Sequence, residues 1–172
     1  QSMDLVLRKL NKNNGRDFNN LIAEMENTLK EFTRSENLKQ LSSLFEKGIE
    51  TLKETAAFFG SCMKDKKFLV PVVNTYPFLN LTGNVMAAWL LYWQAGVAEM
   101  KLESILKDKG ISERKGDAYK NLLNSNRDAA FYESKITTAS FFMNHVLPQA
   151  LAIRESIETG DISPVKMRED LF

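Results

Sequence analysis

Cysteine and histidine, which often bind metal ions or act as nucleophiles and bases, each occur once in the 172 residues. Cys62 has no second cysteine with which to form a disulfide, which fits a reducing compartment and leads us to expect a cytoplasmic protein. The residue three positions before His145 is Phe142, so the Glu-x-x-His pair of di-iron helical bundles is absent. The sequence therefore predicts no metal site.

The sequence also lacks the motifs that commonly mark an active site. Its 8 glycines form no glycine-rich phosphate loop, and no serine lies in a nucleophile turn. A catalytic cleft needs titratable groups that converge, and few such groups lie off the solvated faces of the expected helices. From the residues alone we expect a helical scaffold with no catalytic residue of its own.

Neither charge sign is in excess, since 23 Lys and Arg residues are interspersed with 22 Asp and Glu residues. This balance recommends neither nucleic acid nor an acidic membrane surface as a partner. Short basic clusters such as Arg114-Lys115 fall where helices are expected to end, and we interpret them as solvated helix ends. The apolar run over 85–93 is far shorter than the roughly 20 apolar residues that cross a bilayer, so no membrane span is expected.

One stretch, Phe78 to Met100, is apolar nearly all the way round a helix, and it predicts the central element of the fold. We expect this helix to continue to about Lys109 and to stop at Gly110. Trp89 and Trp93 lie one turn apart within it. Because large aromatic rings contribute much of the buried area of a core, both tryptophans are expected to dominate the packing.

Apolar residues at spacings of three and four predict further amphipathic helices around the central one. Pro148 lies inside the last apolar stripe, which resumes in phase beyond it, so we expect one bent helix that ends at Gly160. The predicted helices cover residues 18–32, 38–63 and 132–157, and a short apolar segment predicts another over 3–10.

These elements predict an all-α fold, an up-and-down bundle of about four long helices with a short N-terminal helix. No strand pattern or internal repeat is evident, and residues 1–172 are expected to form a single helical domain. The C-terminal tail, residues 161–172, either docks on the bundle through Ile162, Val165 or Leu171 or is disordered.

Six side chains are candidates for contact with a ligand between the helices. Each has a structural alternative, because buried amides usually satisfy one another or a backbone carbonyl, and tyrosine is often a core residue. The candidates are Asn80, Asn84, Tyr92 and Gln94 on the central helix, and Tyr132 and His145 on the last one.

Four segments resemble, in sequence order, parts of a known enzyme family. The first is similar to the segment that directly follows the Tyr-Glu-Gly-Thr strip, with its catalytic glutamate, in FAD-dependent acyl-CoA dehydrogenases of the enlarged bacterial type. The others resemble the extra C-terminal helical domain of those enzymes, which include methylthiopropionyl-CoA dehydrogenases. The segments are Gln1-Ser2-Met3-Asp4-Leu5-Val6-Leu7-Arg8-Lys9-Leu10, Phe78-Leu79-Asn80-Leu81-Thr82-Gly83 with Trp89, Phe131-Tyr132-Glu133-Ser134-Lys135, and His145-Val146-Leu147-Pro148-Gln149-Ala150.

The resemblance implies a parent enzyme that dehydrogenates acyl-CoA thioesters, as in fatty-acid β-oxidation, with FAD as cofactor and an electron-transfer flavoprotein as electron acceptor. It also implies that the catalytic glutamate would precede Gln1, and that this chain lacks the flavin-binding and middle domains and is inactive alone. Gln1 is then the one candidate for contact with the flavin. The helices would have a structural role, packing on the dehydrogenase core or contributing to a homodimer.

Two hypotheses remain open. As the C-terminal piece of a dehydrogenase, the chain should expose an apolar patch and self-associate, and Gln1 and Ser2, which precede Met3, would be native residues. As a free-standing protein-interaction module, it would begin at or just before Met3 and present a groove to a partner helix.

Overall fold

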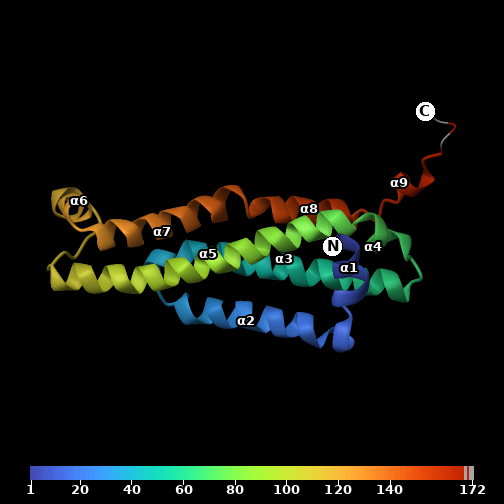
Figure 1. Ribbon diagram of the computed structural model, residues 1–172, viewed down its shortest axis with the longest axis horizontal. Helices are drawn as coiled ribbons and strands as arrows, with labels where there is room; N and C mark the ends of the chain where they lie inside the picture. The colour runs from blue at the N-terminus through green and yellow to red at the C-terminus, as the bar shows by residue number, and fades with distance from the viewer. Residues whose placement is uncertain (169, 171–172) are drawn as a thin grey trace.

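The computed structural model describes residues 1–168 and 170 of the chain, and every regular element within them is helical (Figure 1). The predicted all-α fold is therefore confirmed. The elements are α1 (Ser2–Asp4), which continues into the π-helical turn η1 (Leu5–Lys9), the 3₁₀ turns η2 (Lys12–Gly15) and η3 (Glu36–Leu38), and the helices α2 (Arg16–Phe32), α3 (Lys39–Lys64), α4 (Leu69–Val73), α5 (Thr75–Asp108), α6 (Gly116–Ser125), α7 (Arg127–His145), α8 (Pro148–Glu158) and α9 (Ser163–Lys166).

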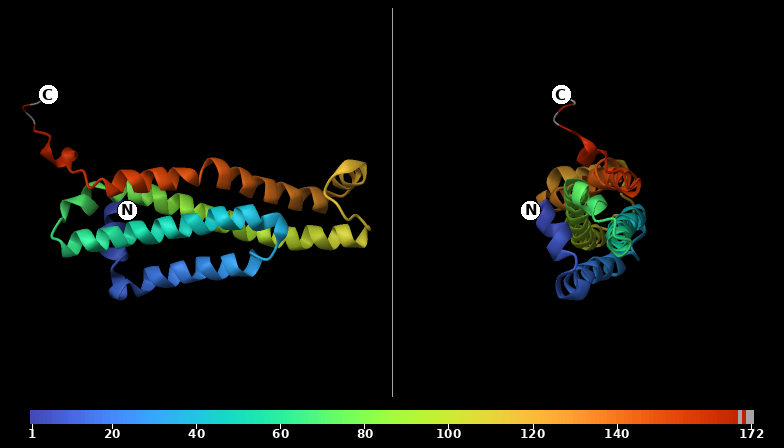
Figure 2. Two further views of the ribbon diagram at one scale, coloured as in Figure 1. Left: turned by 180° about the vertical axis from the view of Figure 1, so that it is seen from behind. Right: turned by 90° about the vertical axis from the view of Figure 1, so that its right-hand side faces the viewer.

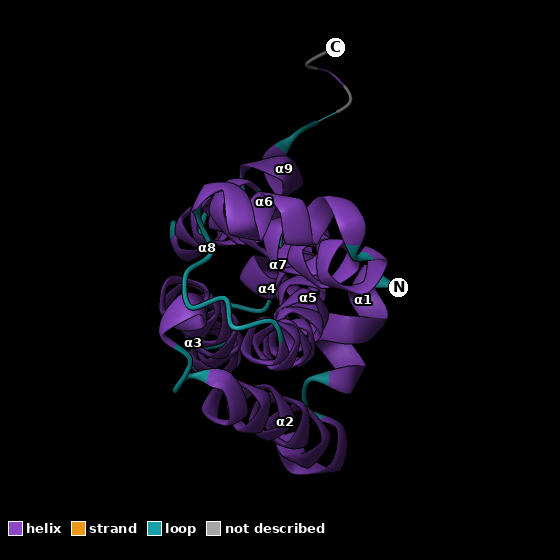
Figure 3. Cartoon of the chain, turned by 90° about the vertical axis from the view of Figure 1, so that its left-hand side faces the viewer, coloured by secondary structure: helices purple, strands orange, loops and turns teal. Residues whose placement is uncertain are grey.

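The bundle has the expected up-and-down arrangement. Its four antiparallel segments are α2, α3, α5 and the pair formed by α7 and α8 (Figure 2). Within that pair, α8 continues in the direction of α7. α5 has 34 residues and is therefore about 51 Å long. It lies in the middle of the bundle, in contact with α1, α2, α3, α7 and α8 (Figure 3).

Tyr92 lies at the centre of the core and is fully buried. The centroid of its ring is 5.0 Å from that of Phe45 on α3 and 6.2 Å from that of Phe32 on α2. Its hydroxyl shares a hydrogen bond of 2.8 Å with Ser42 Oγ, so the polar atom is satisfied. Burial raises the pKa of Tyr92. This one ring therefore joins α2, α3 and α5.

The two tryptophans of α5 do not dominate the core, and that prediction is wrong. Trp89 is only partly buried, and its indole N–H donates to Thr28 Oγ1 of α2 at 2.8 Å. Trp93 is 51% exposed. The reason is that α3 and the α7–α8 pair enclose two sides of α5, while α2 reaches it with Thr28 and Phe32. Over residues 90–100, a fourth side of α5 is left without a covering helix.

The last long segment is two helices rather than the single bent helix that the sequence predicted. α7 ends at His145 and α8 begins at Pro148, because proline has no N–H with which to continue the helical hydrogen bonds. The N–H groups of Val146 and Leu147 both donate to Phe142 O, at 2.9 and 3.0 Å. The apolar stripe stays in phase across the break, as expected. This is seen in Leu147 and in Ala150 and Ile157 of α8, which are all buried.

α6 is a helix that the sequence analysis did not predict. It packs at one end of the bundle, where its buried residues Tyr119 and Leu122 join Leu102 and Leu106 of α5 in a small second core. The connection between α5 and α7 is thus a folded element rather than a simple loop.

The C-terminal tail begins after Gly160 and forms α9, which touches α4 at the end of the bundle opposite α6 (Figure 1). Of the residues expected to dock the tail, Ile162 is partly buried and Val165 is exposed. Leu171 lies outside the residues that the structure describes.

Two glycines allow close approach between segments. A Cβ atom at Gly96 of α5 would lie 2.4 Å from ring atoms of Phe32, so α2 reaches α5 here only because the position has no side chain. At Gly48 of α3 the neighbour is Leu147, whose Cδ1 would lie 3.1 Å from a Cβ atom. The Gly96 contact is the tighter of the two.

We expect Gly96→Ala to lower the free energy of unfolding, because an overpacking cost of about 1–3 kcal/mol exceeds the gain of at most about 1 kcal/mol in helix propensity. Gly83→Ala is the matched control in the same helix, since nothing lies within 4 Å of its added Cβ, and it should be neutral or stabilising. Urea unfolding followed by circular dichroism measures both variants. Equal stability of the two would contradict the close contact between α2 and α5.

Candidate functional site

One side of α5 presents large apolar side chains to solvent. Leu90, Trp93, Val97 and Met100 are 46%, 51%, 38% and 53% exposed. Their spacing of three and four residues places them on a single side of the helix. A contiguous group of this kind marks an interaction surface, whereas single exposed apolar residues are common on any protein.

α7 extends this surface across a shallow groove with a volume of about 460 Å³. Phe131 of α7 is 54% exposed, and Lys135 Nζ lies 5.0 Å from the centroid of its ring, close enough for a cation–π contact. The groove is lined by Trp93, Gln94, Val97 and Ala98 from α5 and by Phe131, Tyr132 and Lys135 from α7. We define Leu90, Trp93, Val97, Met100 and Phe131 as the α5–α7 face.

Two of the candidate residues from the sequence, Gln94 and Tyr132, lie beside this face, in the lining of the groove. Asn84 lies ten residues before Gln94, which is about 15 Å along the helix, and Asn80 lies farther still. Asn80 is exposed and Asn84 is partly buried. The structure therefore does not bring the three amides of α5 together.

The remaining candidates occupy separate parts of the bundle. Tyr92 is the buried core residue described above. His145 is exposed at the end of α7, where the centroid of its ring lies 4.9 Å from that of Phe141. Gln1 is exposed at the start of α1, and its carbonyl oxygen accepts a hydrogen bond from the N–H of Leu5 at 2.9 Å. These residues share no site.

A buried polar cluster that the sequence analysis missed lies near the C-terminal end of α5. Glu99 is 2% exposed and accepts two hydrogen bonds from the guanidinium of Arg114, each of 2.7 Å. Asn37 Nδ2 donates a third, also of 2.7 Å, to Glu99 Oε1. Because a buried carboxylate is costly unless it is paired, the cluster holds the loop before α6 and the turn η3 against α5.

Arg114 was expected at a solvated helix end, and that interpretation is wrong. The loop returns to α5, which directs the guanidinium inward, whereas the neighbouring Lys115 is exposed as expected. The sequence did carry one signal, because Glu99 is in phase with the buried residues Ala95 and Leu102. A charge on the apolar side of a helix predicts that a partner exists, although it does not identify the partner.

A second hydrogen-bonded pair joins α6 to α7. Tyr119 OH donates to Glu133 Oε2 at 2.7 Å. Burial, followed by the hydrogen bond and the charge of Glu133, raises the pKa of Tyr119 well above its ordinary value. The pair therefore fixes α6 on α7 with a phenol that stays protonated.

The features of a metal or redox centre are not found in the described residues. They contain no group of three or more His, Cys, Asp or Glu side chains that could hold a metal ion. Cys62 is buried and free, and burial raises the pKa of its thiol, which disfavours the reactive thiolate. In the same part of the chain, no helix combines the length and hydrophobicity needed to traverse a bilayer.

Residues 21–168 match the model of a protein family described as acetyl-CoA dehydrogenase C-terminal like. The chain belongs to this family. The whole chain also aligns, at 27% identity, with the broad-specificity linear acyl-CoA dehydrogenase FadE5 of Mycobacterium tuberculosis. It spans 26% of the length of that relative. The resemblance seen in the sequence is thereby confirmed.

We expect Arg114→Ala to lower the free energy of unfolding of this C-terminal dehydrogenase domain by about 3 kcal/mol, because it leaves the buried Glu99 carboxylate unpaired. Lys115→Ala removes an exposed cation from the next position and should change stability by less than about 0.5 kcal/mol. Adding Glu99→Gln to Arg114→Ala should recover part of the loss, since no buried charge is then left. Denaturant titration measures all three, and a small effect of Arg114→Ala would rule out a buried ion pair.

The raised pKa of Tyr119 predicts a loss of stability in alkali. The unfolded chain ionises this phenol near its ordinary pKa of about 10, whereas the folded domain keeps it protonated, so the free energy of unfolding falls as pH rises above about 10. Tyr119→Phe should remove part of this slope while also lowering stability at neutral pH. Unfolding curves on both sides of the ordinary pKa provide the measurement, and an unchanged alkaline slope would refute the assignment to Tyr119.

Proposed function

We propose that this chain is the C-terminal helical domain of a larger FAD-dependent acyl-CoA dehydrogenase, in which it supports the catalytic part without carrying out chemistry itself. The observation that carries the proposal is the alignment of the whole chain with about a quarter of FadE5, a linear acyl-CoA dehydrogenase. The reaction of such a parent is the α,β-dehydrogenation of acyl-CoA thioesters, as in fatty-acid β-oxidation, for which FAD supplies the hydride acceptor when bound. The catalytic glutamate would precede Gln1.

The residues of this chain do not fit a flavin site by themselves. Dinucleotide sites of the doubly wound kind use a glycine-rich turn between a strand and a helix, and the described residues contain no strand. The α5–α7 groove is lined mainly by apolar groups and lacks a convergent set of polar ones. We therefore assign FAD binding, acyl-CoA binding and contact with an electron-transfer flavoprotein to the rest of the parent, which we propose is cytoplasmic.

The α5–α7 face supports a packing role. Its side chains are large and apolar, and each contributes about 1.5–3 kcal/mol when it moves from full exposure to full burial. In this domain they are 38–54% exposed, so each side chain has already gained part of that free energy. Covering the face would add the remaining part for each side chain. We propose that the face packs against the catalytic part of the parent, and that in the isolated chain a second copy takes its place.

The test of the proposed function begins with the coding sequence upstream of Gln1. It should encode flavin-binding and middle domains and end in Tyr-Glu-Gly-Thr directly before Gln1. The product of the whole frame should hold FAD and reduce a dye acceptor with acyl-CoA, whereas the 172-residue chain should do neither. A start codon at Met3 without this strip would overturn the proposal in favour of a free-standing interaction module.

We expect the isolated chain to form a homodimer through the α5–α7 face, because apolar surface that the parent would cover is exposed. Replacing Trp93 and Val97 together by glutamate should give a monomer, as measured by light scattering after size exclusion. Phe141→Glu is the matched control, since this aromatic side chain is 62% exposed and lies outside the face. A monomeric unmodified chain, or dissociation by the control alone, would count against the packing role.

A further inference from the structure

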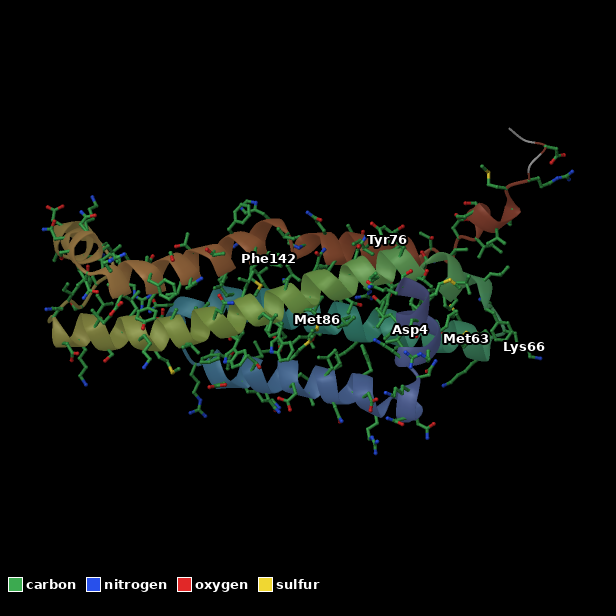
Figure 4. The ribbon with its side chains drawn as sticks, in the orientation of Figure 1. Asp4, Met63, Lys66, Tyr76, Met86 and Phe142 are labelled. Atoms are coloured by element: carbon green, nitrogen blue, oxygen red, sulfur yellow. The ribbon has the colours of Figure 1, made fainter. Side chains whose placement is uncertain are left out.

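A second hollow lies where the N-terminal helix and the start of α2 meet α3. Its volume is about 590 Å³, within the roughly 300–1,000 Å³ typical of small-molecule sites. It lies toward the end of α3 that carries Met63, beside the N-terminal helix that carries Asp4 (Figure 4). The hollow is separate from the α5–α7 face, since no residue of α5 or α7 lines it.

The walls of the hollow are mainly apolar, although Asn11 and Asn19 also line it, and they come mostly from the N-terminal helix, α2 and α3. Leu7 of the N-terminal helix, Phe18 of α2 and Met63 of α3 are among them. Small residues of α3 also line the hollow, and two of them, Ala57 and Gly60, are exposed along it. A Cβ atom built at Gly60 would have nothing within 4 Å, so the space above this residue is open. A slender apolar group can therefore lie along α3.

The charged residues of the lining differ in whether they are already paired. Lys53 Nζ donates to Glu26 Oε1 at 2.7 Å, and Glu54 forms an ion pair with Arg154. Lys64, at the other end of the hollow, forms no ion pair with any residue that the structure describes. The hollow thus offers one available positive charge, and that charge lies at one end of an apolar channel.

We propose that this hollow binds a straight-chain carboxylate of the fatty-acid type, with the chain along α3 and the carboxylate at Lys64. α3 rises about 16 Å between Lys53 and Lys64, which leaves room for an extended chain of about twelve carbons. The apolar walls drive burial of the chain, and Lys64 fixes its direction.

The inference goes beyond the proposed function, because neither dehydrogenation nor the packing of the α5–α7 face uses this hollow. It concerns the side chains of this domain alone. It can therefore fail or succeed whether or not the chain is part of a dehydrogenase.

The experiment is calorimetric titration of the 172-residue chain with dodecanoate, and we expect saturable binding of one molecule per chain. Gly60→Leu should weaken binding at least tenfold, because its side chain grows into the open space without meeting a neighbour. Gly83→Leu makes the same change in α5, away from the hollow, and should leave binding unchanged. Circular dichroism checks that both variants keep the helical fold.

The direction of the chain is tested at Lys64. Lys64→Gln should weaken binding of dodecanoate by about fivefold, the effect of an exposed ion pair worth about 1 kcal/mol, and should leave binding of 1-dodecanol unchanged. Lys67→Gln, at an exposed lysine outside the lining, should affect neither ligand. No saturable binding, or equal binding by Gly60→Leu, would overturn the proposal. If Gly60→Leu instead changes the oligomeric mass, a second copy rather than a carboxylate occupies the hollow.

Discussion

The contact between the Phe32 ring and Gly96 sets how the other helices surround α5. It brings the end of α2 so close that no side chain fits between them, and the Tyr92 ring packs against Phe32 in the next turn. From this point α2 diverges from α5 toward the other end of the bundle, as two opposite views show (Figures 1 and 2). The N-terminal helix lies across the widening space, and the hollow beside α3 lies where that space is not filled.

The same constraint leaves the domain with two surfaces of different character. Over residues 90–100, one side of the apolar helix α5 is not covered by another helix, so it is exposed together with Phe131 of α7. That surface is broad and shallow, and it suits a flat protein partner. The hollow between the N-terminal helix, α2 and α3 has Lys64 at one end, and we propose that it takes a small amphiphile. Under the proposals above, the α5–α7 face packs against a catalytic core while the hollow remains a separate site.

Spacing of apolar residues predicted the long helices because each of them buries one side, and periodicity reports this directly. It could not predict which side of α5 would be exposed, since nearly every position of 85–93 is apolar. Residue size misled as well, because Tyr92, with a hydroxyl that Ser42 can satisfy, took the central place rather than Trp93. At Pro148 the phase of the stripe was right, but one missing N–H was enough to end the helix.

The polar cluster around Glu99 was harder to predict than the helices, because it depends on residues that are far apart in the sequence and meet only in the folded domain. Glu99 was visible as a charge on an apolar stripe, but its partners come from a loop and a 3₁₀ turn that carry no periodic signal. α6 was missed for a different reason, since a segment of only ten residues is too short to establish a helical period. The family resemblance rested instead on short segments, and it identified what periodicity could not.

The three hydrogen bonds to the Glu99 carboxylate have a consequence for how the chain folds. Asn37 lies 62 residues before Glu99 in the sequence, and Arg114 lies 15 residues after it. The carboxylate loses its water only when both partners are in place, so ordering of the turn before α3 and of the loop after α5 is a single cooperative event. We therefore expect the distal half of the longest helix to open only together with the turn before α3 and the loop after α5.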